Sequence, residues 1–147
     1  MQLNHMARNS FALPLDDEQI ADFEKEYGLQ LPELLKEFYR KYNGRRIHPV
    51  SFQYKGQDFQ VDGFIPLLVG SVSVDHILDI YRNANRIPAG WIPLAVSDSG
   101  DDYFLDSENG PVYLVEIDRP CHHIEAAQSL EAFFRFMGFG KDGQPET

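Results

Sequence analysis

The sequence predicts an α+β fold: a single domain whose mostly antiparallel sheet is covered by about four helices. Apolar residues recur at helical spacing near both ends of the chain and once in its middle. The segments between them alternate apolar and polar residues or form short apolar runs bounded by turn residues. Most of these strands follow one another through short turns instead of crossover helices, which favours antiparallel pairing. The length of 147 residues matches one domain.

Two helices are expected before the first strand. Asp16 or Asp17 can cap a helix that ends near Tyr27, because Gly28 suits the left-handed position that follows many helices. A second helix is expected over residues 32–42, with a proline in its first turn and a wide apolar stripe before an Asn-Gly pair.

Strands dominate the middle of the chain. Alternation over residues 48–61 predicts a β-hairpin, and residues 64–69 predict a buried strand interrupted by Pro66. Ser73 can cap a helix that runs to about residue 84.

The second half is expected to contain further strands and one closing helix. Residues 91–96 form one strand, and residues 103–105 pair with 112–117 as a hairpin across a turn at 107–110. Ser129 can cap the last helix. We therefore expect an N-terminal arm at 1–15, the domain at 16–138 and a flexible tail at 139–147.

Composition excludes several classes of protein. Lys and Arg number 13 against 23 Asp and Glu, a net charge of −10 that disfavours nucleic acid and favours a basic partner. The single cysteine, Cys121, excludes an internal disulfide framework and fits either a reducing compartment or a protein indifferent to redox conditions. The sequence shows neither a signal peptide nor an apolar run long enough to span a membrane, so we expect a cytoplasmic protein that does not bind membranes.

The charge is unevenly distributed along the chain. Residues 16–35 carry a net charge of −6 and residues 36–55 carry +5, whereas residues 98–118 contain seven Asp and Glu and no Lys or Arg. Two interpretations remain open from the sequence. These segments are either solvated faces that neutralise one another on folding, or the acidic segment is a surface for a partner.

Chemical motifs predict no catalytic residue, no metal ligand and no cofactor. A calcium loop starting at Asp98 would need an acidic or Asn ligand at its third position and Glu at its twelfth, where this chain has Gly100 and Asn109. A tight turn over residues 98–101 is the preferred interpretation. Cys121, His122 and His123 are adjacent, and neighbouring residues on a strand point to opposite faces.

Several motifs occur in a fixed order along the chain. They are a first helix ending at Gly28, the pattern LPxxLxxFYxxYNG at 31–44, Phe64-Ile65-Pro66, Ile92-Pro93-Leu94-Ala95, the segment from Asp98 to Asp106, and Ser129-Leu130-Glu131-Ala132-Phe133-Phe134. Together they resemble the SUKH superfamily over residues 16–138. That family includes a fungal regulator of cell-wall synthesis and bacterial immunity proteins of polymorphic and contact-dependent toxin systems. The chain departs from the family pattern at Arg45-Arg46, where a second glycine is common.

The resemblance implies a non-enzymatic immunity protein that binds and neutralises a cognate toxin, with a basic nuclease as the expected kind of toxin. The alternative is a regulatory scaffold for protein partners in cell-wall control. Carboxylates of the acidic segment would bind Lys or Arg of the toxin. An aromatic side chain that is exposed in the free protein would become buried in the complex and anchor the interface. The expected partner-binding residues are Trp91, Asp98, Asp101, Asp102, Tyr103, Asp106 and Glu108.

Overall fold

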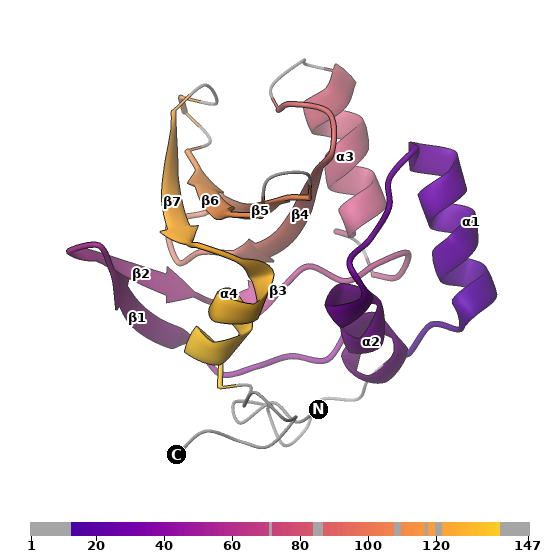
Figure 1. Ribbon diagram of the computed structural model, residues 1–147, viewed down its shortest axis with the longest axis horizontal. Coiled ribbons are helices and arrows are strands. Elements are labelled where there is room, and N and C mark those ends of the chain that lie inside the picture. Colours follow the sequence, from indigo (N-terminus) through magenta and orange to yellow (C-terminus); the bar gives the residue numbers. More distant parts are fainter. Residues whose placement is uncertain are drawn as a thin grey trace.

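A computed structural model describes residues 13–70, 72–83, 87–107, 110–116, 118–119 and 122–138. These residues form four helices and seven strands (Figure 1). In chain order the elements are α1 (Asp17–Tyr27), α2 (Glu33–Tyr42), β1 (Val50–Tyr54), β2 (Gln57–Val61), β3 (Gly63–Phe64), α3 (Val74–Asn83), β4 (Trp91–Val96), β5 (Asp102–Asp106), β6 (Val112–Val115), β7 (His123–Ala127) and α4 (Leu130–Phe136).

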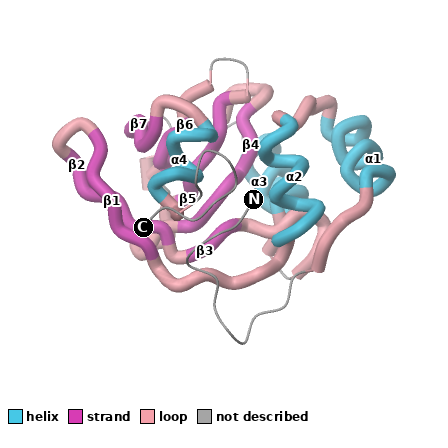
Figure 2. Tube along the Cα trace, turned by 60° about the horizontal axis from the view of Figure 1, so that its bottom comes forward, coloured by secondary structure: helices cyan, strands magenta, loops and turns pink. Residues whose placement is uncertain are grey.

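The strands form two antiparallel sheets. β1 and β2 make a separate hairpin, and the other five strands lie in the order β3-β4-β5-β6-β7, so that each strand pairs with its neighbour in sequence. The hairpin lies at one end of the molecule and α1 at the opposite end (Figures 1 and 2). The predicted α+β class and the mostly antiparallel sheet are confirmed.

Helices cover both faces of the five-stranded sheet. Tyr103 and Phe104 are consecutive residues of β5, so their side chains point to opposite faces, and both are fully buried. The ring of Phe104 packs edge-on against Tyr81 of α3, with centroids 5.1 Å apart. The ring of Tyr103 lies 5.5 Å from Phe133 of α4. Thus α3 covers one face, and α4 covers the other.

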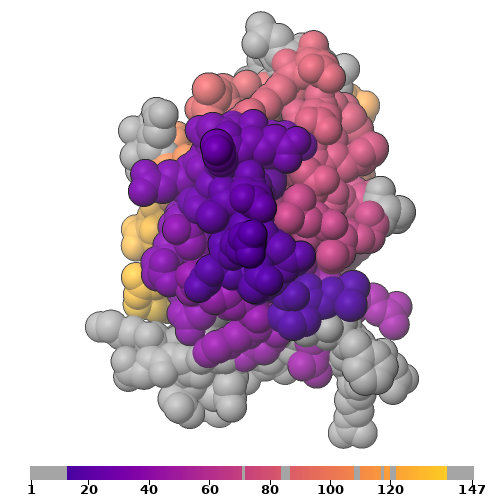
Figure 3. Space-filling model, turned by 90° about the vertical axis from the view of Figure 1, so that its right-hand side faces the viewer, coloured from indigo at the N-terminus to yellow at the C-terminus, as the bar shows by residue number. Residues whose placement is uncertain are grey.

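Helix α1 packs beside α3 (Figure 3). The Tyr27 hydroxyl donates to an Asp79 carboxylate oxygen at 3.1 Å, and Arg82 donates to the Tyr27 carbonyl at 2.9 Å. None of the helices in the described residues is long and apolar enough to cross a membrane.

Local capping explains where the helices begin and end. The Asp16 carboxylate accepts from the Gln19 amide at 2.8 Å, and Gly28 follows α1 with a φ of 63°, as the sequence predicts. Ser129 caps α4 by accepting from the Ala132 amide at 3.0 Å. Pro32 precedes α2 as its cap residue, one position before the expected place.

Two strands differ from the expectation. The predicted strand at 64–69 is wrong beyond Phe64, because Pro66 has no amide hydrogen to donate and Leu68 adopts a φ of 60°. Strand β7 was not predicted, since His123–Ala127 lacks a regular alternation of apolar and polar residues. Its existence depends on pairing with β6.

Candidate protein-binding surface

Ion pairs show what neutralises the basic segment at 36–55. Lys36 lies 3.5 Å from Glu24, and Arg40 lies 2.6 Å from Asp17 and 2.8 Å from Glu33. Two further pairs are Lys41 with Glu37 at 3.4 Å and Lys55 with Glu125 at 2.9 Å. Four of the six basic residues in this segment therefore pair with carboxylates of α1, α2 and β7, outside residues 98–118.

The acidic segment begins in the turn between β4 and β5. The Ser97 amide donates to the Asp101 carbonyl at 2.9 Å, and the Ser99 hydroxyl donates to the Asp101 carboxylate at 3.1 Å. Gly100 has a φ of 87°, which a residue with a side chain rarely adopts. The predicted tight turn is confirmed, and it leaves Asp98 exposed at its tip.

Strand β2 and the residue that follows it bring further carboxylates to this turn. The Tyr103 hydroxyl donates to the Gln60 carbonyl at 2.9 Å and so ties β5 to β2. Burial raises the pKa of Tyr103, and the charges of Asp98, Asp62 and Asp101 raise it further. These three carboxylates, from two separate segments, therefore act on one hydroxyl.

A hollow of about 450 Å³ beside Asp98 completes this surface. Asp58 and Asp98 line it together with the polar and aromatic residues of the β1–β2 hairpin. We call Asp58, Asp62, Asp98 and Asp101 the acidic edge. Among the described residues, no ion pair with Lys or Arg involves Asp58, Asp62 or Asp98. The acidic edge can thus offer carboxylates to basic groups of another molecule.

Asp102 lies in a different environment from the acidic edge. Its carboxylate accepts from the Tyr81 hydroxyl of α3 at 3.3 Å. Burial raises the pKa of Asp102 to about 6; the hydrogen bond from Tyr81 lowers it, and the charge of Asp101 raises it. The acidic segment is therefore divided between the acidic edge and the face of the sheet that α3 covers.

The structure corrects the expectation of an exposed aromatic anchor. Trp91 is 6% exposed, because it stacks on Tyr113 with centroids 4.9 Å apart and its ring also meets His123 edge-on. Tyr103 is fully buried under the β1–β2 hairpin. Neither ring can be a surface anchor in this conformation.

The other predicted partner-binding residues also differ in their exposure to solvent. Asp106 is also buried, and its backbone closes the β5–β6 turn through hydrogen bonds with Gly110 and Pro111. It is therefore not a surface carboxylate. Glu108 lies outside the described residues. Of the six expected partner-binding residues that the structure describes, Asp98 is exposed, and Asp101 and Asp102 are half-buried.

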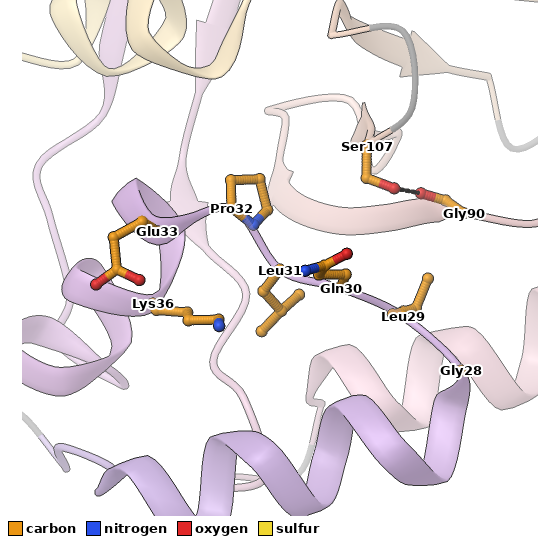
Figure 4. Close-up of a pocket in the computed structure, with 9 residues that line it drawn as sticks. All are labelled: Gly28, Leu29, Gln30, Leu31, Pro32, Glu33, Lys36, Gly90 and Ser107. Atoms are coloured by element: carbon orange, nitrogen blue, oxygen red, sulfur yellow. Dashed lines mark hydrogen bonds between the residues drawn. The ribbon is translucent and has the colours of Figure 1, made fainter.

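A second hollow, of about 640 Å³, lies between the α1–α2 linker and the edge of the five-stranded sheet where β4 begins and β5 ends (Figure 4). Its charged side chains, Glu33 and Lys36, are engaged by Arg40 and Glu24. The Ser107 hydroxyl donates to the Gly90 carbonyl. Among the residues that line this hollow, no nucleophile lies hydrogen-bonded to a general base.

The two described histidines of the Cys-His-His sequence diverge. His122 lies 3.3 Å from Glu116, whereas the ring of His123 packs edge-on against Trp91 and Tyr113. Cys121 lies outside the described residues. Within the described part of the chain, no group of three or more His, Cys, Asp and Glu is placed to hold a metal ion.

Comparison with known proteins identifies a family and a distant relative. The profile of the SMI1 / KNR4 family (SUKH-1) matches residues 14–135. The chain is 28% identical over 115 residues to the SPbeta prophage-derived uncharacterized protein YokK of Bacillus subtilis (strain 168). That similarity covers 65% of this chain and 59% of the relative, so the chain spans less than two thirds of the relative's length.

Proposed function

The chain belongs to the SMI1 / KNR4 family (SUKH-1), and we propose that it is a non-enzymatic immunity protein that binds and neutralises a cognate toxin. The observation that carries the proposal is the acidic edge, where Asp58 and Asp62 of one segment lie near Asp98 and Asp101 of another. The similarity to a prophage-derived protein is consistent with this function.

A basic toxin is the partner that this surface fits. Nucleases that grip phosphates present Lys and Arg, and an acidic inhibitor would occupy those groups in place of the substrate. Complementary charge also accelerates encounter, with association rates up to about 10⁸ to 10⁹ M⁻¹s⁻¹ at low salt. The hollow between Asp58 and Asp98 would receive one such basic side chain.

Capture from the native host is the first test of the proposed function. A tagged full-length chain should retain one dominant protein, and expression of that protein alone should arrest growth. Co-expression of this chain should restore growth. Retention of several proteins, none of them toxic, would contradict the immunity function and favour the regulatory scaffold.

Matched variants then locate the interface. Asp58→Asn/Asp98→Asn removes two negative charges from the acidic edge, and Asp22→Asn/Glu26→Gln removes two from exposed positions of α1, at the opposite end of the molecule. The first variant should slow association with the captured toxin and flatten its dependence on salt; the second should change both much less. Equal effects of the two variants would show that net charge, and not this edge, governs binding.

A further inference from the structure

A third hollow, of about 450 Å³, borders the acidic edge at Asp62 and extends away from it along the loop after α2. The loop after α2 forms one wall, and the segment between β3 and α3 forms another. Arg45 and Arg46 line it together with the apolar side chains of Phe64, Pro66 and Val72. The hollow therefore combines cationic groups with an apolar wall.

Asn43 fixes the backbone from which these arginines extend. This residue is fully buried, and its side-chain amide donates to the carbonyls of Leu13 at 3.1 Å and Leu67 at 2.9 Å. Its side-chain oxygen accepts from the Leu67 amide at 2.7 Å. The Arg45 amide donates to the Tyr42 carbonyl at 3.0 Å in the same turn. The wall of the hollow is therefore held to two distant segments.

The Arg45 guanidinium carries a donor without an acceptor. Its Nε atom is buried and has no hydrogen-bond partner among the described residues. A guanidinium stays charged at all physiological pH values and presents its N–H groups in a planar fork that matches a carboxylate. Among the described residues no ion pair involves Arg45, so an acidic group that enters the hollow would meet an uncompensated cation.

Apolar side chains around the hollow remain accessible to a ligand. Val72 is 51% exposed and Leu13 is 54% exposed. Leu13 borders Gly44, since a Cβ placed on that glycine would lie 3.5 Å from the Cβ of Leu13. A ligand with apolar groups next to its acidic group would bury this surface.

We propose that the hollow binds an acidic side chain of a partner polypeptide, with its carboxylate on the Arg45 guanidinium and its apolar neighbours on Phe64 and Val72. A nucleic acid is disfavoured, because its repeated phosphates would meet both the chain's net charge of −10 and Asp62, which also lines the hollow. One carboxylate flanked by apolar residues meets both features. The proposal does not depend on the immunity function, since any partner with such a segment could use it.

The test uses two capped tripeptides as probes, acetyl-Leu-Glu-Leu-amide and its glutamine counterpart, added to the full-length chain. Nuclear magnetic resonance should show saturable shifts of the Arg45 Nε–H signal and of the Val72 amide with the glutamate peptide. The glutamine peptide should bind about tenfold more weakly or not at all, because it lacks the charged acceptor. Equal binding of the two peptides would overturn the proposal.

Two variants and a control separate the site from general charge effects. Arg45→Gln should abolish the shifts at Val72, and Val72→Ser, at an exposed position, should weaken peptide binding with Arg45 intact. Arg135→Gln removes the same charge from α4 and should leave binding unchanged. Equal loss in Arg135→Gln, no loss in either site variant, or tighter binding of inorganic phosphate or a short oligothymidylate would refute the acidic peptide as the ligand.

Discussion

Replacement of Asp102 by Asn should change how the stability of this protein depends on pH. The pKa of Asp102 is raised from 3.8 to about 6 by burial. A difference of about 2 pKa units corresponds to about 3 kcal/mol, and partial exposure of the side chain reduces this to about 1 to 2 kcal/mol. The native state therefore holds this proton more tightly than the unfolded chain does.

The tighter binding of this proton in the folded state decides how stability changes with pH. Between about pH 4 and pH 6 the folded protein binds more protons at Asp102 than the unfolded chain, so this residue's contribution to stability is present at low pH and is lost as the pH rises through about 6. In the Asp102→Asn variant the side chain at this position cannot ionise, so the variant does not lose this contribution to stability as the pH rises. Relative to the wild type, the variant should therefore gain about 1 to 2 kcal/mol of unfolding free energy between pH 4 and pH 7.

Urea unfolding followed by circular dichroism at pH 4, 5, 6 and 7 measures this gain. The difference between variant and wild type at each pH cancels the other titrating groups that the two proteins share. Asp22→Asn, at an exposed position of α1, is the matched control for the loss of one carboxylate. A difference that falls with rising pH would show that the hydrogen bond from Tyr81 outweighs burial, and would refute the reasoning.

Four further variants test other parts of the structure. Tyr81→Phe removes the hydrogen bond that lowers the pKa of Asp102, so a nuclear magnetic resonance titration of that carboxyl should give a still higher pKa. Asn43→Ala leaves buried backbone groups of two segments without partners and should cost about 2 to 4 kcal/mol in urea unfolding; a cost below about 1 kcal/mol would contradict its bridging role. Phe133→Ala opens a cavity among aromatic rings of both sheets and should cost about 3 to 5 kcal/mol in the same assay. Asp16→Ala removes the cap of α1 and should lower the unfolding free energy by about 1 kcal/mol, with no loss expected for Asp22→Ala in the same helix.

Local signals made most of the elements predictable from the sequence. The cap at Asp16, the left-handed Gly28 and the Ser129 cap act within a few residues, so they locate helix ends without any knowledge of the fold. The β1–β2 hairpin also follows from local pattern, since Lys55 and Gly56 both adopt positive φ in a two-residue turn between paired strands. Strand β7 has no comparable signal of its own.

The candidate site was predicted only in part. Asp98 belongs to the acidic segment by sequence, whereas Asp58 and Asp62 reach it through tertiary contacts, among them the hydrogen bonds from Tyr103 to Gln60 and from the Asp62 amide to the Val96 carbonyl. Burial of Trp91 was missed for a related reason. A strand covered on one face exposes alternate residues, and the sequence does not say that this sheet is covered on both.

By itself the sequence determined the α+β class, the helix ends and the presence of one acidic and one basic segment. Only the tertiary structure decided what those charges do. Arg40 and Lys36 are neutralised by carboxylates of α1 and α2. Asp98, in contrast, stays exposed beside Asp58 and Asp62 of another segment. The physical reason is range: backbone capping and side-chain periodicity act over a few residues, whereas the availability of a charge depends on which distant groups the fold brings within a few ångströms of it.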